Sequence, residues 1–266
     1  MKKTIFFRND DVRECIDLEL EKLVEIFVVA NVPLSLAVEP ANVTKEVVDW
    51  LIDQKKKHRD VIEIIQHGYD HNKNMVYPKS TEFGGARGYD DQFADLKKGK
   101  EVMDNYFGNL WFPAMAFPYG SYNTPALQAL EKLKFKVVTV GVDFSFKHRI
   151  KNMLGKIAGK DILFSKKVAY HNQIRKKYHF FELDTSVNII KKYITIDTGT
   201  HFTLNEIMDK VENDFKYSNV IGILFHHRFH TNELLMIEQL VQKLKEKGYQ
   251  FTTFEKMQLK VPKSKK

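Results

Sequence analysis

The chain has 266 residues, of which 43% are hydrophobic and 12% aromatic, and its formal net charge is +8. This composition excludes a largely disordered chain and is sufficient for the core of one large α/β domain. The single cysteine, Cys15, excludes an internal disulfide. The N-terminal apolar run stops at Arg8, which is too early for a secretion signal, and no stretch could span a bilayer. We therefore expect a cytoplasmic protein.

The predicted strands and helices alternate along most of the chain. Apolar runs predict strands at 4–7, 33–38, 61–65, 112–117, 136–140, 220–225 and 249–253. Helices are predicted between them, including one with Thr124 as N-cap and one that follows a Thr203–Glu206 capping box. The stretch 141–200 is the least regular. This alternation favours a parallel barrel or a doubly wound sheet, with no linker that divides the chain.

The positive charge is concentrated between residues 146 and 180, where ten Lys or Arg residues accompany a single acid, Asp161. A second basic cluster at 259–266 is predicted to be a frayed tail. A solvated basic face is the commoner meaning of such runs, and an anionic glycan, a phospholipid surface or a nucleic acid is the alternative. Nucleic acid is the least favoured of these partners, because no recognition motif accompanies the charge.

Polar residues that could carry chemistry follow four of the predicted strands. They are Asp10 with Asp11, His67 with His71, Pro118-Tyr119-Gly120, and His226-His227. In a closed parallel barrel these strand ends meet at one face. If the chain turned into a helix after residue 66, the two histidines would share one side of it. Two histidines and a carboxylate can form an open metal site, while a second carboxylate and a further histidine can act as base and acid.

Each of these features also has a plainer interpretation. Asp10 or Asp11 could cap a helix that starts near Val12, and a single histidine is more often structural than a ligand. Pro118-Tyr119-Gly120 alone is typical of a turn before a helix. His226 and His230 are also four residues apart and could form a competing metal site, ranked lower because no strand-end carboxylate completes it.

The order of these motifs resembles the polysaccharide deacetylase (NodB-homology) family, which is carbohydrate esterase family 4 with its relatives. The resemblance rests on Asn9–Val12, His67–His71, Phe117–Asn123 and Leu224–His226, and so runs along nearly the whole chain. It implies a single-domain, distorted (β/α)7-8 barrel over residues 1–258, with a basic irregular insertion at about 141–200 and a tail at 259–266. It also implies removal of acetyl groups from sugars with a divalent metal, usually Zn²⁺, with Co²⁺ or Ni²⁺ as alternatives.

The resemblance also implies roles for individual residues. Asp11, His67 and His71 correspond to the metal ligands, Asp10 to the general base and His226 to the general acid.

Pro118, Tyr119 and Gly120 correspond to a substrate-binding turn, in which the backbone N–H of Tyr119 faces the oxyanion. The family usually carries an arginine two residues before this proline, where it steadies the base, but Ala116 stands here. Arg87 lies in a segment that resembles an insertion of some family branches, and we predict that it replaces the missing arginine. The usual fourth motif, an Asp and Trp pair, is not recognisable.

We therefore predict a metal-dependent hydrolase that removes an acetyl group from an N-acetylated sugar. The expected carbohydrate substrate is cytoplasmic and linked to phosphate or lipid, and the basic segment would suit a phosphate or peripheral contact with an anionic bilayer. One alternative keeps fold and metal but hydrolyses another non-peptide C–N amide bond. A second is a catalytically silent barrel that binds carbohydrates or anions. The oligomeric state is not indicated.

Overall fold

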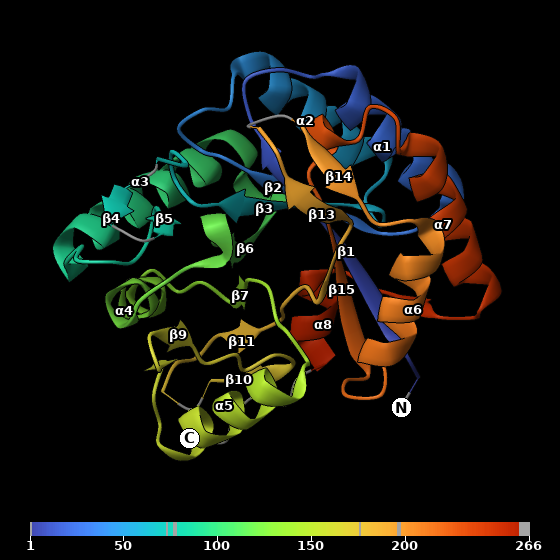
Figure 1. Cartoon of the computed structure of the whole chain (residues 1–266). Helices are drawn as coiled ribbons and strands as arrows, with labels where there is room; N and C mark the ends of the chain where they lie inside the picture. Colours follow the sequence, from blue (N-terminus) through green and yellow to red (C-terminus); the bar gives the residue numbers. More distant parts are fainter. Residues whose placement is uncertain (1, 73, 77–78, 176, 196–197, 261–266) are drawn as a thin grey trace. The chain divides into compact units, whose positions relative to one another are not determined.

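The computed structural model describes residues 2–72, 74–76, 79–175, 177–195 and 198–260 (Figure 1). The chain groups into two compact units, each built from separate stretches of sequence. The first contains Met1–Val38, Val43–Ile64 and Thr185–Thr253, and the second contains Glu39–Asn42, Ile65–Asp184 and Phe254–Lys266. Strand β3 (Ile62–His67) gives its first three residues to the first unit and its last three to the second.

The other elements of the first unit are strands, helices and one 3-10 turn. They are β1 (Thr4–Val12), α1 (Leu18–Ala30), β2 (Leu34–Val38), α2 (Lys45–Lys57), β12 (Val187–Asn188), β13 (Ile190–Tyr193), β14 (Gly199–His201), α6 (Leu204–Asp214), β15 (Val220–Phe225), the 3-10 turn η3 (His227–Phe229), α7 (Leu234–Glu246) and β16 (Gln250–Phe251).

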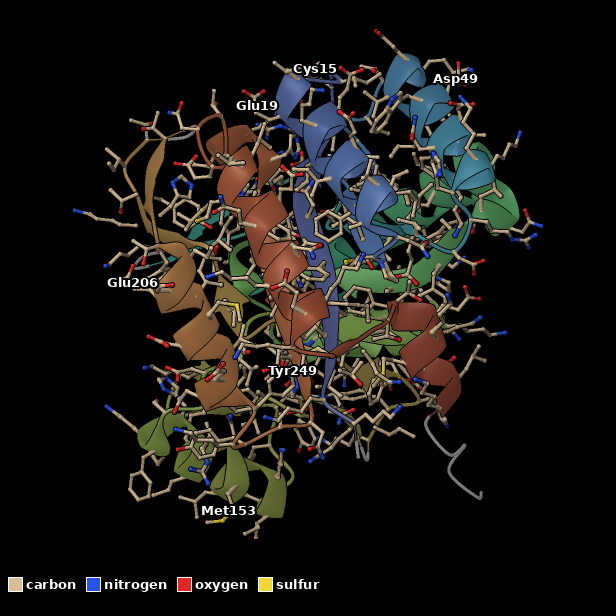
Figure 2. The ribbon with its side chains drawn as sticks, turned by 90° about the vertical axis from the view of Figure 1, so that its right-hand side faces the viewer. Cys15, Glu19, Asp49, Met153, Glu206 and Tyr249 are labelled. Carbon is tan, nitrogen blue, oxygen red and sulfur yellow. The ribbon has the colours of Figure 1, made fainter. Side chains whose placement is uncertain are left out.

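Parallel strands form the centre of this unit. Their order is β2-β1-β15-β12, with β16 also paired to β1. Helices α1, α7 and α6 lie side by side along the outer face of β1 and β15 (Figures 1 and 2). Nearly every residue of β1, β2 and β15 is buried, so both faces of these strands are covered, which explains their nearly continuous apolar runs.

Aromatic side chains fix the packing between β1, β15 and α1. Phe7, Phe27 and Phe225 are all fully buried, and the ring centroids of Phe7 and Phe27 are 4.8 Å apart in an edge-to-face arrangement. Gly222 lies opposite Phe6 in the β1–β15 register, and a Cβ at Gly222 would come within 2.2 Å of the Phe6 ring. This close approach explains a glycine in the middle of a buried strand.

The second unit contains the remaining elements. They are β4 (Asn74–Val76), β5 (Lys79–Thr81), α3 (Tyr89–Phe107), η1 (Gly108–Leu110), β6 (Trp111–Ala116), η2 (Pro118–Gly120), α4 (Thr124–Lys132), β7 (Val137–Thr139), α5 (Phe146–Ile157), β8 (Ile162–Leu163), β9 (Lys166–Lys167), β10 (Gln173–Ile174), β11 (Phe181–Glu182) and α8 (Phe254–Lys260). Strands β6, β7 and β11 are parallel neighbours, and the antiparallel β10 follows at the edge. Helices α3 and α4 lie next to each other (green in Figure 1).

The predicted α/β class and most predicted elements are confirmed, with several local corrections. Strand β1 does not end at Arg8 but continues to Val12, and helix α1 begins only at Leu18. The N-cap of α4 is Asn123, whose side chain accepts the N–H of Ala126, so Thr124 is the first helical residue.

The stretch that sequence reasoning treated as irregular contains the three-turn helix α5, and a final helix, α8, follows the last strand. Residues 261–266 of the predicted basic tail lie outside the described part of the chain. Among the described residues, no helix is both long and apolar enough to cross a membrane.

Candidate metal centre and catalytic residues

Strand β1 carries a β-bulge where its two aspartates stand. In the register with β2, Asn9 lies opposite Leu36, while Val12 lies opposite Val38, so β1 contains one extra residue between these pairs. Asp11 takes a left-handed conformation with φ 63°. Such bulges re-aim side chains, and aspartate tolerates this conformation better than most residues.

A buried ion pair fixes Asp10. Arg8 and Asp10 are two residues apart on a strand, and their side chains therefore point to the same side. The distance from Nε of Arg8 to Oδ1 of Asp10 is 2.8 Å, and that from Nη2 to Oδ2 is 2.9 Å. Because both residues are buried, this two-point contact holds the carboxylate in one orientation.

The interpretation of Asp10 or Asp11 as a helix cap is wrong. The N-cap of α1 is Asp17, whose Oδ1 accepts the N–H of Leu20 at 2.8 Å.

The turn after β15 holds His226 through its neighbours. Asn9 accepts the N–H of His227 at 2.9 Å, and its amide lies 3.0 Å from Nδ1 of the His227 ring. The backbone N–H of His226 itself donates to Nε2 of His230 at 3.1 Å. Two consecutive N–H groups at this strand end are therefore bound by side chains, which restrains the backbone that carries His226.

His230 lies in the middle of a chain of hydrogen bonds, and only one placement of the ring protons satisfies all of these bonds when the rings of His230 and His201 are both neutral. Nε2 of His230 accepts from His226, so the neutral ring carries its proton on Nδ1, which lies 3.2 Å from Nε2 of His201. His201 then carries its own proton on Nδ1, which lies 3.0 Å from Oε1 of Glu233. Burial, together with the neighbouring histidines, lowers the pKa of His230 to about 2, so this ring stays neutral.

These hydrogen bonds argue against the competing metal site that the spacing of His226 and His230 suggested, because Nε2 of His230 binds the backbone N–H of His226. One ligand atom each of His201, His230 and Glu233 lies within 4.8 Å of the others, which is compatible with a metal site. However, the only unprotonated nitrogen of a neutral His230 already accepts a backbone N–H. Metal binding through Nδ1 would require an imidazolate, so the hydrogen-bond chain is the better description.

Tyr193 on β13 contacts His226 and is affected by the charges of Asp10 and Asp11. Its hydroxyl lies 3.5 Å from Nδ1 of His226 and accepts a hydrogen bond from Asn188 at 3.0 Å. Burial raises the pKa of Tyr193 to about 12, and the charges of Asp10 and Asp11 add to the rise. The phenol therefore stays protonated beside both carboxylates and the histidine.

In the second unit, a turn rather than a helix brings His67 and His71 together. Gly68 has φ 57° and His71 has φ 55°, so the chain reverses through two left-handed residues. The two imidazole centroids are nevertheless 5.2 Å apart. A Cβ at Gly68 would lie 2.2 Å from Oε2 of Glu82 and 2.5 Å from Cγ of Pro118. Only glycine fits here, because of both the backbone conformation and the lack of space.

The buried carboxyl group of Glu82 supports this turn. Its Oε1 accepts the N–H of Tyr69 at 2.7 Å and that of Asp70 at 3.1 Å. Burial raises the pKa of Glu82 to about 8, although these two donors oppose the rise. Through these two hydrogen bonds, the carboxyl group binds the backbone between His67 and His71 directly.

Hydrogen bonds also fix the tautomers of His67 and His71. Nδ1 of His67 lies 3.1 Å from the carbonyl oxygen of Ala116 and must donate to it. The Tyr119 hydroxyl donates to the carbonyl of His71 at 2.9 Å and so accepts from Nδ1 of the same residue at 3.0 Å. Both rings therefore carry their proton on Nδ1, and Nε2 of each keeps the lone pair that binds a metal. Such outer hydrogen bonds orient metal-binding histidines.

The Pro118-Tyr119-Gly120 turn is a 3-10 turn in which Tyr119 has φ 57°. The hydroxyl group of Tyr119 forms hydrogen bonds with His71, a role that the sequence did not predict. Whether the Tyr119 N–H faces an oxyanion stays a prediction.

Arg87 is bound within its own segment. Its guanidinium donates to the carbonyl of Glu82 at 2.7 Å and to Asp95 at 2.5 Å. The arginine that pairs with Asp10 is Arg8. Arg8 therefore steadies this carboxylate, which is the role that we predicted for Arg87. A contribution of Arg87 to substrate binding stays a prediction.

Sequence reasoning missed Arg8, Tyr193, Glu82 and the His201–His230–Glu233 chain. The i, i+2 spacing of Arg8 and Asp10 was a usable signal, because side chains two apart on a strand share a side. Glu82 and His201 lie far from their partners in sequence, and no local pattern marks them. His226 and His230 are four residues apart, but that spacing was interpreted as a possible metal site and not as a hydrogen bond.

Comparisons with known proteins show the fold. No protein-family model and no curated protein matches the sequence. Among solved structures, the family 4 acetyl xylan esterase from Clostridium thermocellum, in complex with a cobalt ion, is similar with a TM-score of 0.58 at 13% identity, over 96% of this chain and 90% of that chain. The chain has the fold of the CE4 proteins. This confirms the predicted family resemblance and distorted-barrel class at the level of fold.

Two further solved structures, one from a xylanase and one of a pseudoenzyme, are also similar to this chain. The Xyl-CE4 domain of a multidomain xylanase from the hindgut metagenome of Trinervitermes trinervoides has a TM-score of 0.56 at 14% identity, over 100% of this chain and 95% of that chain. A CE4 family pseudoenzyme from Bacillus anthracis has a TM-score of 0.55 at 13% identity, over 97% of this chain and 66% of that chain. The fold thus occurs in both enzymes and pseudoenzymes, and the function must be argued from the residues.

Proposed function

We propose that the chain is a metal-dependent hydrolase that removes an acetyl group from an N-acetylated sugar. The observation that carries the proposal is the pair of fixed tautomers at His67 and His71, because the proton on Nδ1 leaves Nε2 of each ring in the unprotonated form that ligates a metal. The similarity to a CE4 esterase solved with a cobalt ion supports the same reading.

We assign Asp11, His67 and His71 as the metal ligands. One carboxylate and two imidazoles are a donor set that suits zinc, and cobalt or nickel are alternatives. When bound, the metal would supply Lewis-acid activation of the attacking water and of the carbonyl group.

The remaining chemistry falls to Asp10 and His226. Asp10 accepts the proton of the attacking water, and its pairing with Arg8 holds the carboxylate in position for this step. His226 donates a proton to the departing amine nitrogen, which is a poor leaving group without it. Tyr193 orients the His226 ring from Nδ1.

Metal analysis is the first test. The purified protein should hold about one equivalent of zinc or cobalt, and Asp11→Ala and His67→Ala should each abolish it. His179→Ala is a matched control, because it removes an exposed histidine that pairs with Glu131, and it should keep the metal. Protein that holds no metal under any loading condition would favour a carbohydrate- or anion-binding barrel.

Acetate release from a panel of N-acetyl sugars is the second test. Asp10→Asn should lower turnover by roughly 10²-fold or more while the metal content stays the same. Asp49→Asn on α2, an exposed aspartate labelled in Figure 2, is the control and should leave turnover unchanged. Metal-loaded protein that hydrolyses other amides but no N-acetyl sugar would point to the alternative C–N hydrolase.

A further inference from the structure

Helix α5 exposes its apolar side chains. Phe146, Ile150, Met153, Leu154 and Ile157 are spaced as one stripe along the helix, and all five are exposed. Phe146 and Ile157 have 76% and 78% of their surface accessible. A surface helix normally buries such a stripe in the core, so α5 has the opposite orientation.

Contacts of the opposite side explain this orientation. Gly155 is the buried residue of α5, and a Cβ there would lie 2.4 Å from Cγ2 of Val168. Asn152 accepts the backbone N–H of Ala169 at 3.1 Å, and the ammonium of Lys151 donates to the carbonyl of Lys167. The helix therefore packs through a glycine and polar groups, and the apolar stripe points away from its own unit.

The adjoining β8–β9 hairpin presents one more apolar residue. Leu163 pairs with Lys166, so Phe164 and Ser165 form a two-residue turn, with φ values of 52° and 55°. Turns with two left-handed residues favour Asn and Gly, and phenylalanine is an unfavourable choice. Phe164 nevertheless stands at the tip with 75% of its surface exposed. Folding stability does not explain this residue.

Cations surround the exposed apolar residues. Lys147, Arg149, Lys160 and Lys166 are all exposed on α5 or the segment that follows it. The one acid between residues 146 and 180, Asp161, is buried and paired with the equally buried Arg175 at 2.7 Å. It therefore does not offset the positive charge at the surface.

We propose that α5 and the β8–β9 turn dock on the surface of an anionic phospholipid bilayer. The occupant follows from the combination of features: apolar side chains that can enter the acyl boundary and flanking cations that attract acidic headgroups. A protein partner or a nucleic acid would not need both an apolar tip and a predominantly basic rim, in which the exposed Asp143 before α5 is paired with His148. The inference goes beyond the proposed hydrolysis and does not depend on it. Together, the two would bring the chain to a lipid-linked saccharide.

Flotation of the full chain with vesicles tests the proposal. Wild-type protein should bind vesicles of phosphatidylcholine with about one third phosphatidylglycerol, and bind pure phosphatidylcholine at least ~10-fold more weakly. The combined variant Phe146→Gln, Ile157→Gln and Phe164→Gln should lose at least ~10-fold of this binding. The matched control replaces three comparably exposed residues elsewhere, Val29, Leu235 and Leu259, by glutamine and should bind like the wild type.

Charge and depth give independent readouts. Lys147→Gln with Arg149→Gln should weaken binding by roughly fivefold for each cation removed, and added salt should weaken it as well. When vesicles are added, the tryptophan emission of Phe164→Trp should shift to the blue by more than that of the wild type, which contains only Trp50 and Trp111. Brominated lipid should quench this emission.

Three results would overturn the proposal. The first is equal vesicle binding by the wild type and the triple glutamine variant. The second is no vesicle binding by the wild type, together with a concentration-dependent dimer that the triple variant dissolves, which would assign the surface to a second copy of the chain. The third is no vesicle binding and salt-sensitive binding of single-stranded DNA that survives in the triple variant.

Discussion

Replacement of Arg8 by methionine tests the most consequential contact of the first unit. Arg8 and Asp10 are 2% and 3% exposed, and their two N···O distances are 2.8 and 2.9 Å. Methionine keeps most of the aliphatic volume but leaves a carboxylate buried without its cation. Removing one partner of such a pair is expected to destabilise the fold by about 3–5 kcal/mol. At ~2–4 °C per kcal/mol, the melting temperature should fall by roughly 6–20 °C.

Calorimetry or urea unfolding measures this effect, and a double-mutant cycle isolates the pair. Adding Asp10→Asn to Arg8→Met should recover part of the loss, because it removes the uncompensated charge. Lys45→Met is the matched control, since it breaks an exposed ion pair with Asp49 and should change stability by ~1 kcal/mol or less. If Arg8→Met melted within about 2 °C of the wild type, the ion pair would not hold Asp10, and the reasoning would fail.

Three other contacts give predictions of different kinds. Tyr119→Phe removes the acceptor of the His71 Nδ1 proton and should weaken zinc binding ~10–100-fold in competition with a fluorescent chelator; unchanged affinity would contradict the assigned tautomer. The fold raises the pKa of Glu82 from 4.5 to about 8. Between these two pH values the Glu82 carboxyl group ionises in the unfolded chain but stays protonated in the folded one, so the metal-free protein should become less stable as the pH rises through this window. Urea unfolding should show this loss, on the order of a few kcal/mol, and Glu82→Gln should remove most of it; an equal slope in the variant would refute the assignment. His230→Phe leaves the His226 N–H without its acceptor, so turnover of an N-acetyl amide should fall ~10-fold or more, whereas aryl acetates with good leaving groups should be little affected. Equal losses on both substrates would indicate general damage rather than misplacement of the acid.

The alternation of strands and helices could be predicted because buried parallel strands are apolar along their whole length. Strand β15 has the predicted bounds, and helix α6 begins with the predicted Thr203–Glu206 capping box. The end of β1 could not be predicted in this way. Polar residues normally terminate a buried strand, but here Arg8 and Asp10 satisfy each other, and Asn9 binds His227. The strand therefore continues through a polar run that resembles a loop.

The histidine motif was identified for a partly wrong reason. The spacing of His67 and His71 would bring the two rings together if this segment were a helix, whereas the structure has a turn with left-handed Gly68 and His71. The glycine was the local signal for such a turn. The support from Glu82 comes from a segment more than ten residues later and has no local signature.

Helix α5 shows a different limit of sequence reading. Its apolar residues recur with helical spacing, so the helix itself was predictable from Phe146, Ile150 and Ile157. A sequence pattern does not show which side of a helix faces the rest of the protein. That the stripe faces outward depends on the contact between Gly155 and Val168, which only the fold creates.

Acetate release by the zinc-loaded protein from N-acetylated sugars is the decisive measurement for the proposed hydrolysis. The wild type should release acetate, while Asp10→Asn should bind about one equivalent of zinc and be slower by ~10²-fold or more. Wild-type protein that binds zinc through His67 and His71 yet releases acetate from no sugar of the panel would contradict the proposed hydrolysis.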